Sequence, residues 1–388
     1  MNTPSEAMIL DAGFASLPLQ QALKQAGFAT LACSGKANDP GMAYADRSRL
    51  QNYADTEAVL TIARKEHIAA LVPGVTDVSY LSGCRVAATL GLPGFDSPEV
   101  SDTLFLKDQF RAWSSRQGLP IPQAVSDQTQ AITLPLPLIV KPVDAYSGKG
   151  ITLVRVWSEL DAAVEAARLA SPGGQYVIET FCEGQLYSHS AFIRKGRIAC
   201  EFFVEEHCTV YPWQVNSSSL NQSLNEAMCC QISDCMQTIV SELDLVDGLL
   251  HTQFIASEKT FWLIELTRRC PGDLYSSLIE LSTGMPYSRW FIEPFIGVNS
   301  VFPERRPVHR RAIARHTIST AEETLFTGFK FACLPAHLVE VIPLKAVGET
   351  VKPAPGDRAG LIFAEFNDFL ALRQATAHLK NFFSIKAC

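Results

Sequence analysis

The chain has 388 residues, more than a single compact core usually accommodates, so we expect two or three subdomains. Apolar residues make up 47% of the sequence and charged residues 19%, and aromatic and aliphatic residues run from end to end, which excludes a largely disordered chain. The net charge of −7 argues against nucleic acid as the main partner, because phosphate backbones require a basic face.

The sequence also argues against membrane and zinc-binding classes. No run approaches the roughly 18 apolar residues of a membrane span, and residues 1–7 lack the positive charge of a targeting segment. The eleven cysteines are scattered and form no Cys-x-x-Cys pair. We therefore expect reduced thiols, a cytoplasmic location, no membrane partner and no zinc site.

Short apolar runs alternate with helical patterns in the first third of the chain, which predicts a parallel α/β domain over residues 1–103. The turn after the first strand, Asp11–Ala15, lacks the Gly-x-Gly-x-x-Gly spacing of a dinucleotide site. We expect instead a packing domain with a ligand crevice at its strand ends. The predicted strands are Ala7–Leu10, Ala29–Cys33 and Ala69–Val72, and the predicted helices are Leu17–Gln25, Asp55–His67 and Leu81–Leu90.

The kind of predicted element changes after residue 117. A predicted helix over Lys107–Gln117 ends at the sequence Gly-Leu-Pro-Ile-Pro. Strands joined by glycine turns then mix with helices, as in an α+β arrangement. The predicted helices are Ser158–Leu169, with Ser158 as its N-cap, Ser219–Leu243 and Asp368–Asn381. The predicted strands include His251–Ala256, Thr260–Leu266, Arg311–Thr317, Leu338–Leu344 and Ala359–Phe366.

A first chemical motif is a lysine at the end of an apolar strand, followed by a glycine-rich turn. The strand is Leu138–Pro142, with Lys141 near its end, and the turn is Ser147-Gly148-Lys149-Gly150. An ammonium is costly to bury unpaired, so we expect a partner anion, and glycines let backbone N–H groups approach phosphate oxygens. The alternative interpretation is a strand-end lysine beside an ordinary hairpin.

A second motif is an apolar strand running into a short acidic connection, Tyr176 to Gly184. Such a segment can offer backbone groups to a purine edge, although many strand-to-loop junctions look similar.

The third motif pairs two strands that carry oxygen ligands. An antiparallel pairing would put Gln253 and Glu265 near each other on one face, and oxygen ligands suit Mg²⁺. Arg269 follows, where a guanidinium can grip a phosphoryl or carboxylate group with two hydrogen bonds. The alternative is an edge hairpin with a surface salt bridge.

Taken in order, these motifs closely resemble the ATP-grasp superfamily, in its carboxylate–amine, amino-acid-ligase-like branch. The resemblance covers most of the chain. It implies an N-terminal parallel α/β domain followed by an ATP-grasp fold of two α+β subdomains. The grasp region would span residues 104–300, with a lid subdomain at about 138–185, and residues 301–388 would complete the grasp and add an extension.

The resemblance also implies roles for individual residues. ATP and Mg²⁺, or Mn²⁺, would be the cofactors, and Lys141 and Arg269 would act in catalysis, Arg269 by steadying an acyl-phosphate. Metal ligation would fall to Glu265, with Gln253 where an acid is usual and Thr267 where asparagine is usual. Leu186 stands where a ribose-binding glutamate is usual, and Glu183 would substitute for it. The nucleotide would be held by Lys107 and Lys141 at its phosphates, by Ser147, Gly148, Lys149 and Gly150 as a lid, and by Glu179, Thr180 and Cys182 at its adenine.

The expected function is an ATP-dependent ligase that joins a small-molecule carboxylate to an amine through an acyl-phosphate, with an amino acid as a substrate and a homodimer as the assembly. Two alternatives stand beside it: another ATP-grasp ligase or carboxylase chemistry, and a nucleotide-binding protein that has lost turnover. Residues 211–217 are a candidate substrate wall or a packed loop. The pairs Arg310-Arg311 and Arg315-His316 are candidate carboxylate ligands or parts of a solvated basic stripe, and we favour the stripe for the first pair. His251 and His316 would assist proton removal from the amine or be structural, and we favour the structural interpretation.

Overall fold

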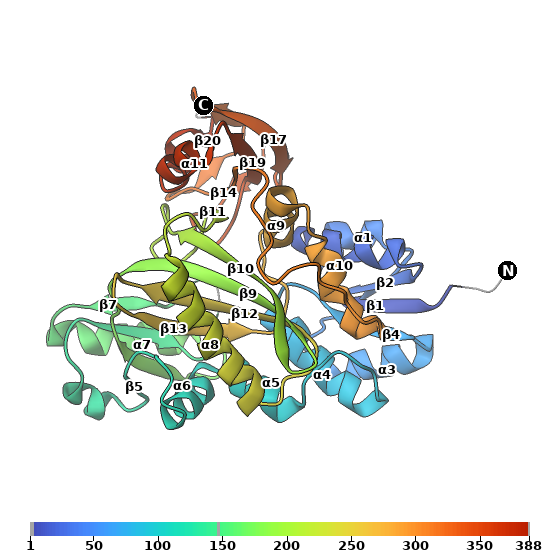
Figure 1. The fold of residues 1–388 in the computed structure, drawn as a ribbon, viewed down its shortest axis with the longest axis horizontal. Coiled ribbons are helices and arrows are strands. Elements are labelled where there is room, and N and C mark those ends of the chain that lie inside the picture. The colour runs from blue at the N-terminus through green and yellow to red at the C-terminus, as the bar shows by residue number, and fades with distance from the viewer. Residues whose placement is uncertain (1–3, 146–147, 387–388) are drawn as a thin grey trace.

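The computed structural model describes residues 4–145 and 148–386. An N-terminal α/β layer lies on one side of a large antiparallel sheet, a small four-stranded sheet lies on the other side, and the C-terminal part extends the large sheet (Figure 1). Among these residues, no helix is long and apolar enough to cross a membrane.

The N-terminal layer is a parallel sheet with the strand order β3-β2-β1-β4. The inner strands consist almost entirely of buried residues, as expected when helices cover both faces of a parallel sheet. The strands are β1 (Glu6–Leu10), β2 (Ala29–Ser34), β3 (Arg47–Leu50) and β4 (Ala70–Pro73), and the helices are α1 (Leu17–Gln25), α2 (Pro40–Tyr44), α3 (Thr56–Glu66), α4 (Asp77–Leu90) and α5 (Pro98–Phe105).

The predicted strands and helices of this layer are present, and three elements were missed. β3 is an edge strand with polar, half-exposed residues, and α2 and α5 are short, so none has a clear hydrophobic period. Helix α4 begins four residues earlier than predicted because the Thr76 side chain accepts a hydrogen bond from the backbone N–H of Ser79.

The small sheet is antiparallel, with the order β5-β8-β6-β7, and packs against α7. Ser158 does not cap this helix; it lies in a 3-10 turn, and the helix starts two residues later. The elements of this region are α6 (Lys107–Arg116), β5 (Ala124–Val125), η2 (Gln128–Thr133), β6 (Leu138–Pro142), β7 (Thr152–Val154), η3 (Trp157–Glu159), α7 (Leu160–Ala170) and β8 (Tyr176–Thr180).

The large sheet has eight strands in the order β13-β12-β9-β10-β11-β14-β19-β17. Helix α8 crosses one face, while α9 and α10 lie between the sheet and the N-terminal layer (Figure 1). The elements are β9 (Gln185–Arg194), β10 (Arg197–His207), β11 (Ser217–Leu220), α8 (Glu226–Glu242), β12 (Gly248–Ala256), β13 (Phe261–Thr267), α9 (Tyr275–Thr283), α10 (Tyr287–Ile292), η4 (Glu293–Ile296), β14 (Ile313–Ile318), β17 (Ala336–Pro343) and β19 (Gly360–Phe366).

The predicted helix over residues 219–243 is wrong in its first turns. Residues 217–220 form strand β11, which pairs with both β10 and β14. The helix begins after Asn225, whose side chain accepts a hydrogen bond from the backbone N–H of Met228. Leu220 fits the helical period of the segment, but its side chain packs in the core on the sheet face that looks toward the N-terminal layer.

The C-terminal part adds two short ladders and one helix to the end of the large sheet. The predicted final helix stops early: after residue 376 the chain makes a 3-10 turn and then a strand. These elements are β15 (Thr324–Leu325), β16 (Phe329–Phe331), β18 (Thr350–Val351), α11 (Phe369–Thr376), η5 (Leu379–Asn381) and β20 (Phe383–Ile385).

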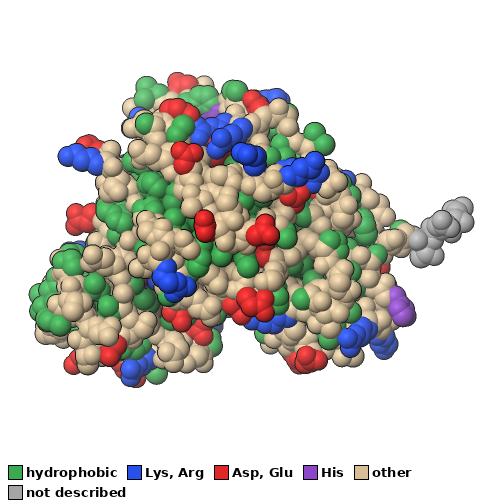
Figure 2. Space-filling view, turned by 60° about the horizontal axis from the view of Figure 1, so that its bottom comes forward, with side chains coloured by type: hydrophobic (Ala, Val, Ile, Leu, Met, Phe, Trp, Pro, Cys, Tyr) green, Lys and Arg blue, Asp and Glu red, His purple; other side chains and the backbone are tan. Residues whose placement is uncertain are grey.

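The predicted fold class is confirmed, with a parallel α/β layer followed by antiparallel α+β sheets. One core cluster contains residues of β1, α1, β9, α9 and α10 together, so the N-terminal layer is packed onto the large sheet. On the face in Figure 2, basic and acidic side chains are interspersed.

Candidate functional site

A buried carboxylate joins two cations beneath the glycine turn. Glu179, near the end of β8, accepts hydrogen bonds from Lys141 Nζ on β6 and from Arg111 Nε on α6, both at 2.7 Å. The carboxylate is completely buried and both cations nearly so. The partner anion that the strand-end lysine required is therefore Glu179.

Two opposing effects act on the pKa of Glu179. Burial alone raises it, but the charges of Arg111 and Lys141 outweigh burial and hold the pKa at about 2. The carboxylate is therefore ionised at neutral pH, and the three side chains carry a net charge of about +1. That surplus positive charge can attract a phosphate.

Lys107 and the glycine turn lie beside this cluster. Lys107 Nζ donates to the backbone oxygens of Val143 at 3.4 Å and Ala145 at 3.1 Å, in the connection that leads to the turn. Gly148 and Gly150 both have left-handed backbone angles, with φ of 73° and 71°. The predicted lid residue Ser147 lies outside the described residues, and Lys149 is exposed.

Both glycines are also required by close packing. A Cβ on Gly148 would lie 2.5 Å from the Trp213 Cβ, and one on Gly150 would lie 2.3 Å from the Ala170 Cβ. The Tyr211 hydroxyl donates to the Gly148 oxygen at 3.0 Å. The segment predicted as a substrate wall or packed loop therefore packs, in part, against the glycine turn.

The residues predicted to face the adenine follow Glu179. The Thr180 backbone N–H donates to the oxygen of Gln123, and the Cys182 thiol is buried, which raises its pKa to about 11. Glu183 is exposed and free to reach a ribose hydroxyl. Because the Glu179 side chain is fully buried between two cations, it can serve a nucleotide directly only through its backbone, and the adenine roles stay predictions.

The predicted pairing of the oxygen ligands is confirmed: Gln253 on β12 lies opposite Glu265 on β13. Both side chains are partly exposed. Thr267 is two residues further on the same face, but its hydroxyl is buried and accepts a hydrogen bond from the Arg269 backbone N–H at 3.2 Å. Gln253 and Glu265 are therefore the more accessible oxygen donors of the three.

Arg111 connects the lysine cluster to the oxygen ligands. Besides pairing with Glu179, it donates from Nη2 to the backbone oxygen of Ile264 at 2.8 Å, next to Glu265. Sequence reasoning missed Arg111, although its position one helical turn after Lys107 was a usable signal. The phosphate-binding and metal-binding candidates thus lie on the two sides of one buried arginine.

These residues fit a magnesium ion held largely by phosphate. Mg²⁺ often takes one or two carboxylates and completes its shell with water and phosphate oxygens, and Glu265 with Gln253 offers one carboxylate and one amide oxygen. No cluster of three or more His, Cys, Asp or Glu side chains able to hold a metal occurs among residues 4–145 and 148–386.

Arg269 contacts an acid from the N-terminal layer. Its Nε donates to Asp77 Oδ1 at 2.6 Å, and its Nη1 donates to the Cys270 oxygen at 3.4 Å. Burial alone lowers the pKa of Arg269, but the negative charges of Asp77 and Glu265 raise it by more. The pKa is therefore raised overall, and the guanidinium stays charged. Asp77, the first residue of α4, was missed because the helix was predicted to start later.

Arg315 belongs to a buried polar group rather than to a solvated stripe. Its Nη2 donates to the Ser218 hydroxyl at 2.6 Å and its Nη1 to the Asp273 oxygen at 3.0 Å, while Nε is buried without a partner among the described residues. Burial raises the pKa of the neighbouring Glu206, which lies 3.7 Å from Arg315. An unpaired buried donor is costly, and an acidic ligand would satisfy it.

The two histidines are buried in the large sheet. His251 Nδ1 is hydrogen-bonded to the Ser190 hydroxyl at 2.9 Å, and His316 Nδ1 to the Ser217 hydroxyl at 2.8 Å. Burial lowers both pKa values, that of His316 to about 3, so both rings are neutral at pH 7. This geometry agrees with their interpretation as structural.

Comparison of the sequence with known proteins gives distant relatives, and no family model matches. The chain is 26% identical over 194 residues to a formate-dependent phosphoribosylglycinamide formyltransferase of Synechococcus sp. (strain CC9311), which is 48% of this chain and 50% of that protein. It is 22% identical over 252 residues to the ATP-grasp enzyme fsqD of Aspergillus fumigatus, 55% of this chain and 43% of that protein. The match thus spans about half the length of these relatives.

Solved structures match over the whole chain. An L-amino acid ligase from Bacillus licheniformis superposes with a TM-score of 0.82 at 18% identity, covering 100% of both chains. A phosphoribosylglycinamide synthetase from Anaerococcus prevotii superposes with a TM-score of 0.76 at 17% identity, covering 99% of this chain and 100% of that one. At such low identity the likeness establishes the fold.

Proposed function

We propose that the chain, which is similar to an ATP-grasp enzyme in sequence and to an L-amino acid ligase in fold, is an ATP- and Mg²⁺-dependent ATP-grasp ligase that joins a carboxylic acid to an amine, with an amino acid as one substrate. The observation that carries the proposal is the connection made by Arg111, which holds Lys141–Glu179 on one side and the strand of Glu265 on the other. This arrangement supports a triphosphate lying between a cationic side and an oxygen-ligand side.

Phosphoryl transfer depends on positioning and charge neutralisation. Lys107 and Lys141 would bind the phosphates, and Arg269 would hold the substrate carboxylate that receives the γ-phosphoryl group. A bound Mg²⁺, held by Glu265 and Gln253, would supply Lewis-acid charge at the phosphate oxygens. The carboxylate oxygen attacks phosphorus and ADP leaves. The amine, after losing its ammonium proton, attacks the carbonyl carbon of the acyl-phosphate; phosphate leaves with the C–O bond electrons, and the nitrogen gives up its remaining extra proton to solvent.

Two further side chains, Arg315 and Asp77, support a substrate with both acidic and basic groups. The unpaired Nε of Arg315 would donate a hydrogen bond to a substrate carboxylate, since that donor otherwise has no acceptor. Asp77, 2.6 Å from Arg269, would bind the ammonium group of the incoming amine beside the activated acid. This placement of an acid and two arginines favours amino-acid substrates.

The glycine turn would exclude water during the reaction. Its contacts with Tyr211 and Trp213 hold it against the substrate side of the fold, and an acyl-phosphate exposed to water would hydrolyse. Mn²⁺ would replace Mg²⁺ at the same oxygen donors. The assembly in the proposal is a homodimer, which light scattering would test.

The experiment is a screen of amino-acid pairs with ATP and Mg²⁺, read by phosphate release, with mass spectrometry of the product. Hydroxylamine added in place of the amine should trap the activated acid as a hydroxamate. ADP and phosphate release that requires both an acid and an amine supports the proposal. ATP bound without turnover for any pair would contradict it and favour a binding protein.

A second candidate is formyl transfer, because the first sequence relatives are formate-dependent phosphoribosylglycinamide formyltransferases. Formate with phosphoribosylglycinamide belongs in the same screen. Turnover with that pair and with no amino-acid pair would replace the first candidate by the second.

A further inference from the structure

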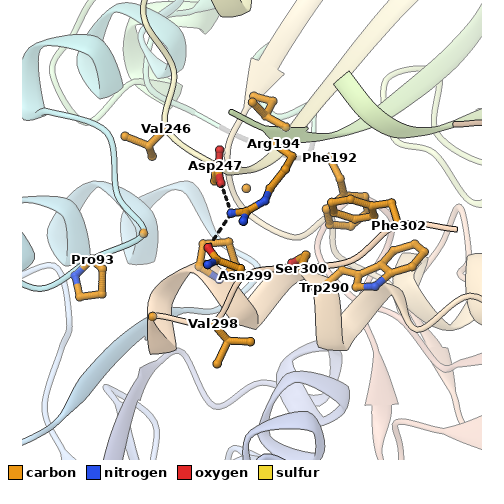
Figure 3. A pocket seen from close by; sticks show the side chains of 15 residues that line it. Pro93, Phe192, Arg194, Val246, Asp247, Trp290, Val298, Asn299, Ser300 and Phe302 are labelled. Carbon is orange, nitrogen blue, oxygen red and sulfur yellow. Dashed lines mark hydrogen bonds and ion pairs between the residues drawn. The ribbon is translucent and has the colours of Figure 1, made fainter. Parts of the chain in front are cut away.

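A cavity of about 230 Å³ lies away from the ligase site, where the N-terminal layer, the ends of β9 and β12, and the α10–η4 segment meet (Figure 3). Gly248, which lines it, is the first residue of β12, whereas Gln253 lies five residues further along the strand. At about 3.4 Å per residue the two are roughly 17 Å apart. The cavity is therefore separate from the phosphate and metal candidates, and it lies at a junction of subdomains, where small-molecule sites are common.

One wall of the cavity is aromatic. The rings of Phe192, Trp290 and Phe302 lie together, with centroids 5.6 Å apart for Phe192–Trp290, 5.7 Å for Phe192–Phe302 and 4.8 Å for Trp290–Phe302. A cavity of about 150 Å³ lined by apolar side chains holds benzene, so this larger one has room for a single ring and a short branch.

The facing wall carries opposite charges with unused hydrogen-bonding capacity. Arg194 Nη1 donates to Asp247 Oδ2 at 2.5 Å and to Asn299 Oδ1 at 2.6 Å (Figure 3). Among the described residues, Nε and Nη2 of Arg194 have no hydrogen-bond partner, so one edge of the guanidinium is open to a planar carboxylate. Asp247 Oδ1 also accepts from the Lys195 backbone N–H at 2.6 Å, so each carboxylate oxygen has one partner and keeps a lone pair for an ammonium. A quarter to a third of each side chain is exposed.

We propose that this cavity binds a small aromatic α-amino acid. The carboxylate would lie on the open edge of Arg194, the ammonium would lie against Asp247, and the ring would lie on Phe302, the partly exposed member of the aromatic wall, which the buried Phe192 and Trp290 support. A purely apolar ligand would leave the charged pair unused, and a simple anion would leave the aromatic wall unused. A dipolar ligand with one ring matches both walls.

A buried hydrogen-bond network of Val246, Asp96 and Arg268 connects the cavity to the ligase site. Val246, which lines the cavity, accepts a hydrogen bond at its backbone oxygen from Arg268 Nη2 at 2.7 Å and donates from its N–H to Asp96 Oδ1 at 2.9 Å. Arg268 Nε donates to Asp96 Oδ2 at 2.7 Å. Because Arg268 precedes Arg269 in the chain, a ligand that shifts residues 246–248 would change the position of Arg269. This regulatory step rests on the proposed function, whereas binding itself does not.

The test is calorimetric titration of the full chain with L-phenylalanine as the probe. We expect saturable binding, with at least tenfold weaker binding of 3-phenylpropionate, which lacks the ammonium, and of 2-phenylethylamine, which lacks the carboxylate. Arg194→Gln and Phe302→Ala should each weaken L-phenylalanine binding at least tenfold. Matched controls are Arg197→Gln, at the exposed position opposite Arg194 in the β9–β10 hairpin, and Val301→Ala, which is 82% exposed; both should bind as the unmodified chain does.

Two results would overturn the proposal. One is no binding of L-phenylalanine at millimolar concentration, or binding that does not distinguish the two analogues. The other is binding lost in Arg315→Gln and kept in Arg194→Gln, which would place the amino acid in the ligase site. If the ligand acts on the ligase site, saturating L-phenylalanine should change the affinity of the unmodified chain for Mg·ADP at least threefold. The same addition should leave the affinity of Arg194→Gln unchanged. Equal affinities of the unmodified chain with and without L-phenylalanine would overturn the regulatory step. Because no readout requires turnover, a failed ligase assay leaves the binding test intact.

Discussion

Replacing Glu179 by glutamine should destabilise the fold strongly. The carboxylate is completely buried and is bonded by both Arg111 and Lys141, so the variant would leave two buried cations with no anion between them. Removing one partner of a buried ion pair costs about 3–5 kcal/mol. The pKa gives a similar magnitude: a fall from the ordinary 4.5 to about 2 corresponds to roughly 3 kcal/mol of stabilisation at neutral pH.

The sign of the pH dependence follows from the lowered pKa. The folded state binds a proton at Glu179 less readily than the unfolded state, so the stabilisation is complete above about pH 4.5 and is lost as the pH falls toward 2. The difference between the unmodified chain and Glu179→Gln should therefore be largest at pH 7 and should shrink below pH 4.5.

The assay is urea unfolding monitored by circular dichroism at a series of pH values. The matched control is Glu183→Gln, an exposed carboxylate in the same connection, which should unfold like the unmodified chain. Equal unfolding midpoints of Glu179→Gln and Glu183→Gln at pH 7, or a loss of stability in Glu179→Gln that does not change with pH, would show that the ionised Glu179 does not stabilise the fold in this way.

Three further substitutions test the site. Glu265→Gln should reduce turnover by at least a hundredfold without changing the melting temperature, because it removes the accessible carboxylate of the metal candidates; near-normal phosphate release would refute the metal assignment. Lys141→Ala should weaken Mg·ATP binding at least tenfold in calorimetry, with the exposed Lys36→Ala as control, and unchanged affinity would count against the phosphate role. Arg315→Lys should raise the KM of the acid substrate at least tenfold with a smaller effect on kcat, since the donor left unpaired at Nε is lost; an unchanged KM would remove Arg315 from the substrate site.

Much of the fold could be predicted because its strands and helices carry strong hydrophobic periods. The parallel N-terminal layer, the pairing of β12 with β13 and the resemblance to the ATP-grasp superfamily are all confirmed. The elements that were missed or misplaced depend on interactions that periodicity does not record. Strand β11 has the sequence Ser-Ser-Ser-Leu and forms because β10 and β14 pair with it. Helix α8 begins where the Asn225 side chain caps it.

The candidate site was predictable where a residue interrupts a pattern and hidden where tertiary contacts define it. Lys141 and Glu265 end or interrupt apolar strands, so both stood out in the sequence as candidates, and their roles stay predictions. Asp77 sits in ordinary local sequence, 192 residues from its partner Arg269, and only the folded chain brings them together. Arg111 likewise meets its carboxylate across 68 residues.

The most direct test of the account is a crystal structure of the chain with a non-hydrolysable ATP analogue and Mg²⁺. We expect the phosphates to lie between Lys107, Lys141 and the glycine turn, with the metal ion at Glu265 and Gln253. A nucleotide bound elsewhere, or a metal ion with no contact to Glu265, would contradict it.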